Sequence, residues 1–259
     1  MMRLIKIAML SLIGLAMVVE TSAQKKKQTK EAVPVKEEVV TQPPPEEPKT
    51  PTIDPMVRHY YKKYALASRW NDAQVAKDAL YDLIAINPET DSLIFNLGYF
   101  YYENRQFASA TLVSQELLAR NPKNLDYLEL SAASFEALGI LDRSLQNYES
   151  LYLLSNSTLT LYKIAFMQFD LKRYEEALTN VNILLGKPDA ATYEIGFNDK
   201  DNNQKDFPME LAVLNLKGLI LQEKGDKAAA KQIFQDIIKK APDFKPAITN
   251  LAELNKTKG

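Results

Sequence analysis

Residues 91–122, DSLIFNLGYFYYENRQFASATLVSQELLARNP, decide the fold of this chain. Their apolar residues recur at spacings of three and four, which is the pattern of amphipathic helices. The stretch contains two such segments joined by a tight turn, and Asn121-Pro122 ends the second segment. Closely related patterns lie before and after it. The stretch therefore predicts a helical hairpin that recurs along the chain.

The recurrence has a period of 34 residues, because Pro88 and Pro122 are 34 positions apart and a further 34 lead to the turn-favouring Asn156. Counted from Asp91, places 4, 7, 8, 11, 20 and 32 are occupied by Ile94, Leu97, Gly98, Tyr101, Ala110 and Pro122. This pattern resembles the tetratricopeptide repeat, W-x2-L-G-x2-Y followed by A-x3-F and P, with Ile94 and Ser114 replacing Trp and Phe. The resemblance implies an all-α, right-handed superhelix, or α-solenoid.

Five helix pairs fit this period, near residues 57–90, 91–124, 125–157, 158–189 and 211–244, with a capping helix at 245–256. Small residues occupy the eighth and twentieth places of most repeats: Gly98, Ala132, Ala165 and Gly218, and Ala76, Ala110, Ala177 and Ala230. One hairpin cannot cover its own apolar faces, so neighbouring repeats stabilise one another. We also expect left-handed turns at Gly139 and Gly225, and helix caps at Asn71 and Asp226.

Residues 187–208 interrupt the repeats. Tyr193, Ile195 and Phe197 alternate with more polar residues, which is the period of a strand. A turn-rich segment, NDKDNN at 198–203, comes next, and residues 204–208 could pair back. We expect a small β-hairpin that projects from the solenoid; a loop without strands is the alternative.

The N-terminus carries the pattern of an export signal at residues 1–23. Arg3 and Lys6 precede an apolar run of 13 residues, 7–19, and small residues before Gln24 suit cleavage. A membrane span needs about 20 apolar residues, so we expect removal of the signal and a periplasmic or otherwise secreted protein with no membrane span. A retained anchor is the alternative. With no Cys in the chain, no lipoprotein cysteine is available.

Residues 24–55 are rich in Pro, Lys and Glu and predict a disordered linker, because such a composition buries too little apolar surface to fold. A tether whose basic start contacts an acidic surface is the alternative. The folded domain is then expected over residues 56–256.

The composition argues against catalysis and against cofactors. The chain has no Cys and His59 is its one histidine, so neither thiolate chemistry nor a His-centred triad is available within the chain. It contains no glycine-rich phosphate loop. The net charge of −1 offers no basic field for nucleic acid. We expect neither an enzyme nor a nucleic-acid-binding protein.

A weak calcium pattern lies at the tip of the predicted hairpin. Asp199, Asp201, Asn203 and Glu210 match the first, third, fifth and twelfth places of a calcium loop. The sixth place, which needs Gly for a sharp turn, is Gln204. A solvated hairpin tip is therefore the preferred interpretation, and we expect no metal.

The family resemblance implies a concave groove lined by the first helix of each pair. Carried over place by place, the groove presents Tyr61, Phe95, Tyr99, Tyr102, Glu129, Glu136, Tyr162, Phe166 and Phe169. This aromatic surface with an acidic middle would suit a peptide with apolar side chains and some Lys or Arg. The alternative for Phe95, Phe166 and Phe169 is packing against the adjacent repeat.

The sequence thus predicts a protein-interaction scaffold of the cell envelope that binds a partner peptide or helix in the groove. The alternative is a structural subunit of an envelope complex that self-associates or docks through the hairpin insertion.

Overall fold

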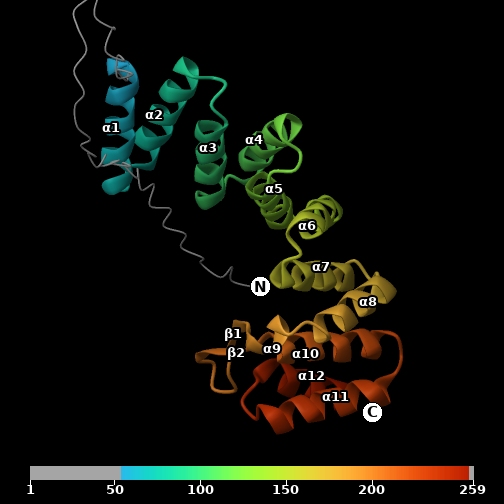
Figure 1. Cartoon of the computed structure of the whole chain (residues 1–259). Helices are drawn as coiled ribbons and strands as arrows, with labels where there is room; N and C mark the ends of the chain where they lie inside the picture. Colours follow the sequence, from blue (N-terminus) through green and yellow to red (C-terminus); the bar gives the residue numbers. More distant parts are fainter. Residues whose placement is uncertain (1–53, 257–259) are drawn as a thin grey trace, which may run out of the picture. The chain divides into compact units, whose positions relative to one another are not determined.

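The computed structural model describes residues 54–256, which form twelve α-helices and one two-stranded sheet. Figure 1 shows the helices following one another in antiparallel pairs. The pairs are α1 (Pro55–Arg69) with α2 (Ala73–Ile86), α3 (Asp91–Glu103) with α4 (Phe107–Arg120), α5 (Leu125–Ala137) with α6 (Leu141–Ser155), α7 (Thr158–Asp170) with α8 (Tyr174–Leu185), and α10 (Met209–Glu223) with α11 (Lys227–Lys240). The last helix, α12 (Lys245–Lys256), packs on α11 and α10. The predicted all-α solenoid of five pairs and a capping helix is confirmed.

Two predictions concern residues outside this part of the chain. The export signal at residues 1–23 lies outside the described residues, and so does the linker except for its last two positions. Those two positions form the start of α1, because Asp54 caps the helix by accepting a hydrogen bond from Met56 N at 2.7 Å and Pro55 is its first residue.

The turn between the two helices of each pair uses a left-handed residue. Gly139 and Gly225 have φ of +75° and +91°, as predicted. Asn71, Arg105 and Lys172 adopt the same conformation at φ of +57° to +60°, although an L side chain disfavours it. Asn71 is therefore a turn residue, and the predicted cap of α2 is instead its neighbour Asp72, which accepts from Val75 N. Asp226 caps α11 as predicted.

The predicted small residues lie where the helices touch. Ala110, Ala177 and Ala230 are fully buried, and a Cβ on Gly98 or Gly218 would overlap side chains of the neighbouring helices. The third repeat has Ser144 at the corresponding place, and its hydroxyl donates to the Ala132 carbonyl oxygen at 2.7 Å. The buried residues form successive clusters between neighbouring helices, which is the packing expected of a repeat protein.

The predicted β-hairpin is confirmed. Strand β1 (Glu194–Asn198) pairs antiparallel with β2 (Gln204–Pro208), and Ile195 faces Phe207 across the ladder. A short helix that the sequence did not predict, α9 (Asp189–Thr192), precedes β1.

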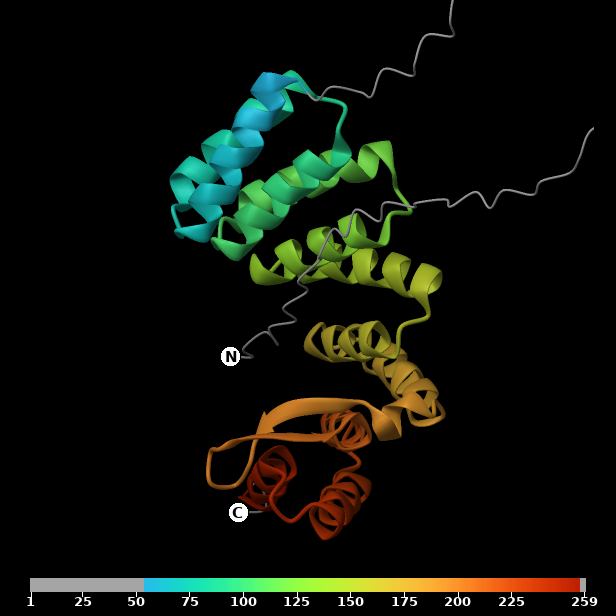
Figure 2. The same ribbon diagram turned by 60° about the vertical axis from the view of Figure 1, so that its left-hand side comes forward.

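The prediction that the hairpin projects from the solenoid is wrong. Phe207 and Phe197 pack edge-on against Phe244, in the turn between α11 and α12, with ring centroids 5.0 and 5.3 Å apart. Lys200 N also donates to the Asp243 carbonyl oxygen at 3.0 Å. Figure 2 shows the hairpin lying beside the C-terminal helices. Packing on Phe244 removes the apolar surface of the Phe197 and Phe207 rings from water, which favours the docked hairpin over a projecting one.

None of the helices in residues 54–256 is both long and apolar enough to cross a lipid bilayer.

Candidate functional site

The first helices of successive pairs bring one set of predicted residues together. Tyr99, Tyr102 and Glu103 share one face of α3, because they are three and four positions apart. Tyr99 is 48% exposed and Tyr102 is half-buried, with its ring edge-on to Phe107 at 5.5 Å. Glu129 and Glu136 of α5 and Asp170 of α7 extend this surface, and we call these six residues the first-helix face.

Three of the four carboxylates of this face act on the same tyrosine, Tyr102. Burial raises the pKa of Tyr102, and the negative charges of Glu136, Glu103 and Glu129 add to the shift, to about 12. Burial and the charge of Glu136 also raise the pKa of Asp170. Carboxylates of α3 and α5 therefore act on Tyr102, and one of them, Glu136, also acts on Asp170 of α7.

A buried tyrosine holds the central carboxylate in place. The Tyr148 hydroxyl on α6 donates to Glu136 Oε2 at 2.9 Å. Lys163 Nζ on α7 donates to the same hydroxyl at 3.2 Å and lies 4.9 Å from the Tyr148 ring centroid. Burial, followed by the charge of Glu136, raises the pKa of Tyr148 well above its usual range. The sequence did not predict this chain of contacts, because Tyr148 occupies an apolar core position of its repeat.

The other predicted aromatic residues belong mainly to the core. The Phe95 ring packs on Tyr127 of α5 at 5.5 Å. Phe166 and Phe169 are half-buried and lie 6.5 Å apart, beside the cluster between α7, α8 and α10. Tyr162 is only 7% exposed within that cluster, so it offers almost no surface to a partner. Tyr61 is 48% exposed on α1. Tyr162 is therefore a core residue, whereas Phe95, Phe166 and Phe169 pack against neighbouring residues and keep part of their surface exposed.

The calcium candidates do not form one site. Asp199 Oδ1 accepts hydrogen bonds from the backbone N–H groups of Asp201 and Asn203 at 2.9 and 2.8 Å, so this carboxylate closes the hairpin turn. Glu210 pairs with Lys240 of α11 at 3.2 Å. Among residues 54–256, no three His, Cys, Asp or Glu side chains are grouped in a way that could hold a metal ion.

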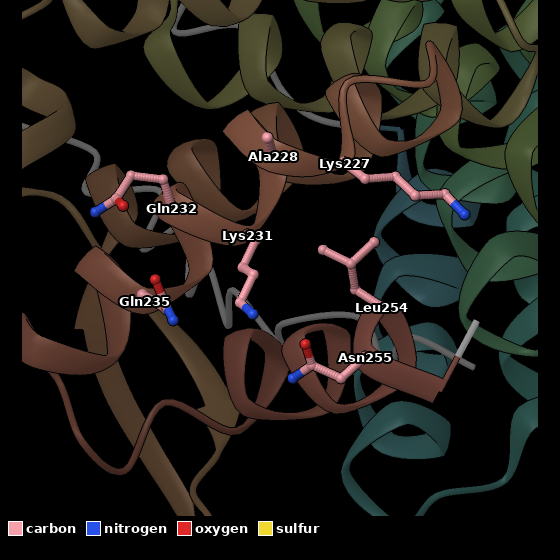
Figure 3. A pocket seen from close by; sticks show the side chains of 7 residues that line it. All are labelled: Lys227, Ala228, Lys231, Gln232, Gln235, Leu254 and Asn255. Carbon is pink, nitrogen blue, oxygen red and sulfur yellow. The ribbon is translucent and has the colours of Figure 1, made fainter. Parts of the chain in front are cut away.

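Two cavities lie away from the first-helix face. Figure 3 shows the larger, of about 380 Å³, between α11 and the end of α12. Its lining is Lys227, Ala228, Lys231, Gln232, Gln235, Leu254 and Asn255. The smaller, of about 200 Å³, is lined by residues of α4, α5 and α6, among them Gln115, Ser131 and Arg143. Neither contains a residue predicted for binding.

Comparison with known proteins agrees with the paired helices. Residues 216–243, from α10 through α11 into the turn before α12, match the family model of the tetratricopeptide repeat. The helix pairs have the fold of tetratricopeptide repeats. No curated protein sequence matches it.

Solved tetratricopeptide repeat structures share this fold at low sequence identity. A protein from Parabacteroides merdae is 17% identical with a TM-score of 0.61, over 77% of this chain and 72% of that one. YrrB, described as having an unusual peptide-binding site, is 14% identical with a TM-score of 0.58, over 74% and 89%. MamA from Desulfovibrio magneticus is 11% identical with a TM-score of 0.56, over 73% and 96%. At these identities the likeness concerns the fold.

Proposed function

We propose that this protein is a non-catalytic interaction scaffold of the cell envelope that binds a peptide or helix of another protein on the first-helix face. The observation that carries the proposal is the exposed side chain of Tyr99 beside the half-buried Tyr102, with the carboxylates of Glu103, Glu129 and Glu136 from α3 and α5 near Tyr102. Tyrosine combines a large apolar ring with a polar tip, which suits a surface that is exposed when free and covered when bound.

The fold supports this use of the surface. Solenoids of stacked helix pairs present extended surfaces that bind partners, and the structural neighbour YrrB is described as carrying a peptide-binding site. In this chain, the first-helix face differs from the core because its tyrosines and carboxylates keep exposed area that no neighbouring helix covers.

The envelope location rests on the N-terminal sequence. The basic head, short apolar run and small residues of positions 1–23 favour export, and the chain has no Cys for lipid attachment. The test is N-terminal sequencing of the protein purified from its native cells, together with its distribution between cell fractions. A mature N-terminus at Gln24 in the envelope fraction supports export. An intact Met1 in the cytosolic fraction would refute it.

The alternative, a structural subunit that docks through the hairpin, has less support. Ile195 and Phe207 of the hairpin are buried, and Phe197 packs on Phe244. The apolar side chains that would have formed such a docking surface are thus already used within the protein.

A binding experiment tests the proposal. Partners are captured by crosslinking from envelope fractions with wild-type protein, Tyr99→Ala, and Tyr99→Ala with Tyr102→Ala. Tyr193→Ala is the matched control, because Tyr193 is 44% exposed and lies away from the first-helix face. We expect both Tyr99 variants to lose partners that wild type and the control retain, with melting curves showing that each protein is folded. Unchanged partners in folded variants would refute the proposal.

A further inference from the structure

We propose that the first-helix face recognises a lysine or arginine side chain of the partner segment, which inserts beside Tyr99 and Tyr102 and pairs with Glu103, Glu136 and Asp170. This inference rests on the proposed function and names the chemistry of the partner at that surface.

The first argument is the unbalanced charge of the face. Eight ion pairs are present within residues 54–256, and none of them includes Glu103, Glu129, Glu136 or Asp170. Glu103, Glu129 and Glu136 thus lie near Tyr102, and Glu136 also acts on Asp170, without a Lys or Arg ion-pair partner in that part of the chain. The charge of Glu136 disfavours the ionised form of Asp170, as like charges do, and a cation from a partner would relieve this repulsion.

The second argument is the mixed character of the surface. The ring of Tyr99 is 48% exposed, and Tyr102 keeps part of its ring at the surface beside the carboxylates. A lysine or arginine has an apolar stem that packs on aromatic rings and a charged head that needs acceptors. Aromatic faces also attract cations directly. A neutral apolar side chain would use the rings but leave the carboxylates unpaired.

The third argument is that the chain already holds a cation at the edge of this network. The Lys163 ammonium contacts the ring and hydroxyl of Tyr148, and the hydroxyl donates to Glu136. The hydrogen bond from the Tyr148 hydroxyl fixes the Glu136 carboxylate, which lowers the entropy lost when a partner binds. The positive charge of Lys163 also opposes an incoming cation, so its removal should strengthen binding.

The experiment selects random displayed peptides on the full mature protein. We expect enrichment of Lys or Arg among peptides whose binding requires Tyr99. The affinity of a selected peptide is then measured at low and high salt for wild type, Glu136→Gln, Asp170→Asn and Lys163→Gln. Glu253→Gln on α12 is the matched control, because it makes the same charge change on an exposed residue remote in sequence.

Glu136→Gln keeps an acceptor for the Tyr148 hydroxyl, so it removes charge with little change in shape. We expect it to weaken binding about fivefold to tenfold, between the effect of an exposed ion pair and that of a hydrogen bond to a charged group. Asp170→Asn should weaken binding in the same direction, Lys163→Gln should strengthen it about twofold to fivefold, and Glu253→Gln should have no effect. High salt should reduce the differences.

The outcomes separate the two proposals. Peptides that require Tyr99 but show no basic enrichment would overturn the cation inference and leave the binding surface in place. Affinities equal in Glu136→Gln, Asp170→Asn and Glu253→Gln would do the same. Failure to select any peptide that requires Tyr99 would overturn both.

Discussion

Replacing Gly218 by alanine tests whether close helix approach holds the last repeat together. A Cβ at this position would lie 2.4 Å from Cε1 of Phe234 and 2.8 Å from its Cζ, whereas carbon atoms in good contact are roughly 3.5–4.0 Å apart. Phe234 is fully buried, in a cluster with Phe207 and Phe244. A ring buried in a close-packed cluster has little room to turn away.

Two effects of the substitution oppose each other. Overpacking of a core typically costs about 1–3 kcal/mol, and the large overlap with the ring places this site in the upper half of that range. Alanine in a helix interior is favoured over glycine by about 0.8–1.0 kcal/mol. The expected net effect is therefore a loss of about 1–2 kcal/mol in the free energy of unfolding, measured by urea denaturation.

Gly98→Ala is the comparison. Its Cβ would meet Leu130 Cδ2 and Val113 Cγ1 at 2.9 Å, both at the ends of side chains, so we expect a smaller loss. Combining Gly218→Ala with Phe234→Leu should cost less than the sum of the two single changes, because the smaller side chain removes the overlap. A Gly218→Ala protein as stable as wild type, or less affected than Gly98→Ala, would refute the reasoning.

The turns, the tyrosines and the hairpin each yield a further prediction. Arg105→Gly and Lys172→Gly should each stabilise the protein by about 0.5–1 kcal/mol. Glycine relieves the strain of the left-handed backbone, about 1–2 kcal/mol, but loses more conformational entropy on folding. A lower urea midpoint for both variants would contradict this. The pKa values of Tyr102 and Tyr162 are raised to about 12 from 10.0, so the folded state holds these protons more tightly than the unfolded state. The contribution of these protons to the free energy of unfolding is therefore complete below pH 10 and is lost as the pH rises from 10 through 12. Denaturation at several pH values, with tyrosinate absorbance as the titration signal, checks the direction. Phe244→Ala should lower the free energy of unfolding by about 3–5 kcal/mol, because the ring is fully buried. It should also make the hairpin susceptible to limited proteolysis. The control Leu153→Ala, at a position that is 83% exposed, should not.

The regular part of the fold could be predicted because each repeat carries its own packing rule. The small residue at the eighth place, as at Gly98, and the proline after the second helix, as at Pro122, locate most pairs without any knowledge of their neighbours. The left-handed turn at Arg105 could not be predicted, because the turn length demands this conformation whatever residue stands there.

The hairpin was predictable as a local pattern and unpredictable in its placement. Strand alternation at Ile195 and Phe197 is read directly from the sequence, but the ring that receives Phe197 and Phe207 is Phe244, more than thirty residues further along. The aromatic residues of a strand alternate with the same period in sequence whether the hairpin projects into solvent or packs on the protein. The partner ring alone distinguishes the two arrangements.

The candidate site was predicted in part for a similar reason. Repeat register placed Tyr99, Tyr102 and Glu136 on one surface, and the structure brings them together. It also placed Tyr162 there, but this residue is 7% exposed and belongs to the buried cluster that includes Met209 of α10 and Ile195 of β1. The repeat register predicts packing only for a regular solenoid. The insertion between α8 and α10 changes the packing against the fourth pair.

The contact between the hairpin and the α11–α12 turn has a mechanical consequence. In a simple solenoid each repeat is held by its nearest neighbours, so a pulling force removes repeats one at a time from either end. Here Phe244 joins a segment that precedes α10 to one that comes after α11, which ties the last pair into a closed loop of chain. When the chain is pulled from its ends, the helices from α1 onward should unfold in sequence. The hairpin with α10, α11 and α12 should unfold last and in a single step.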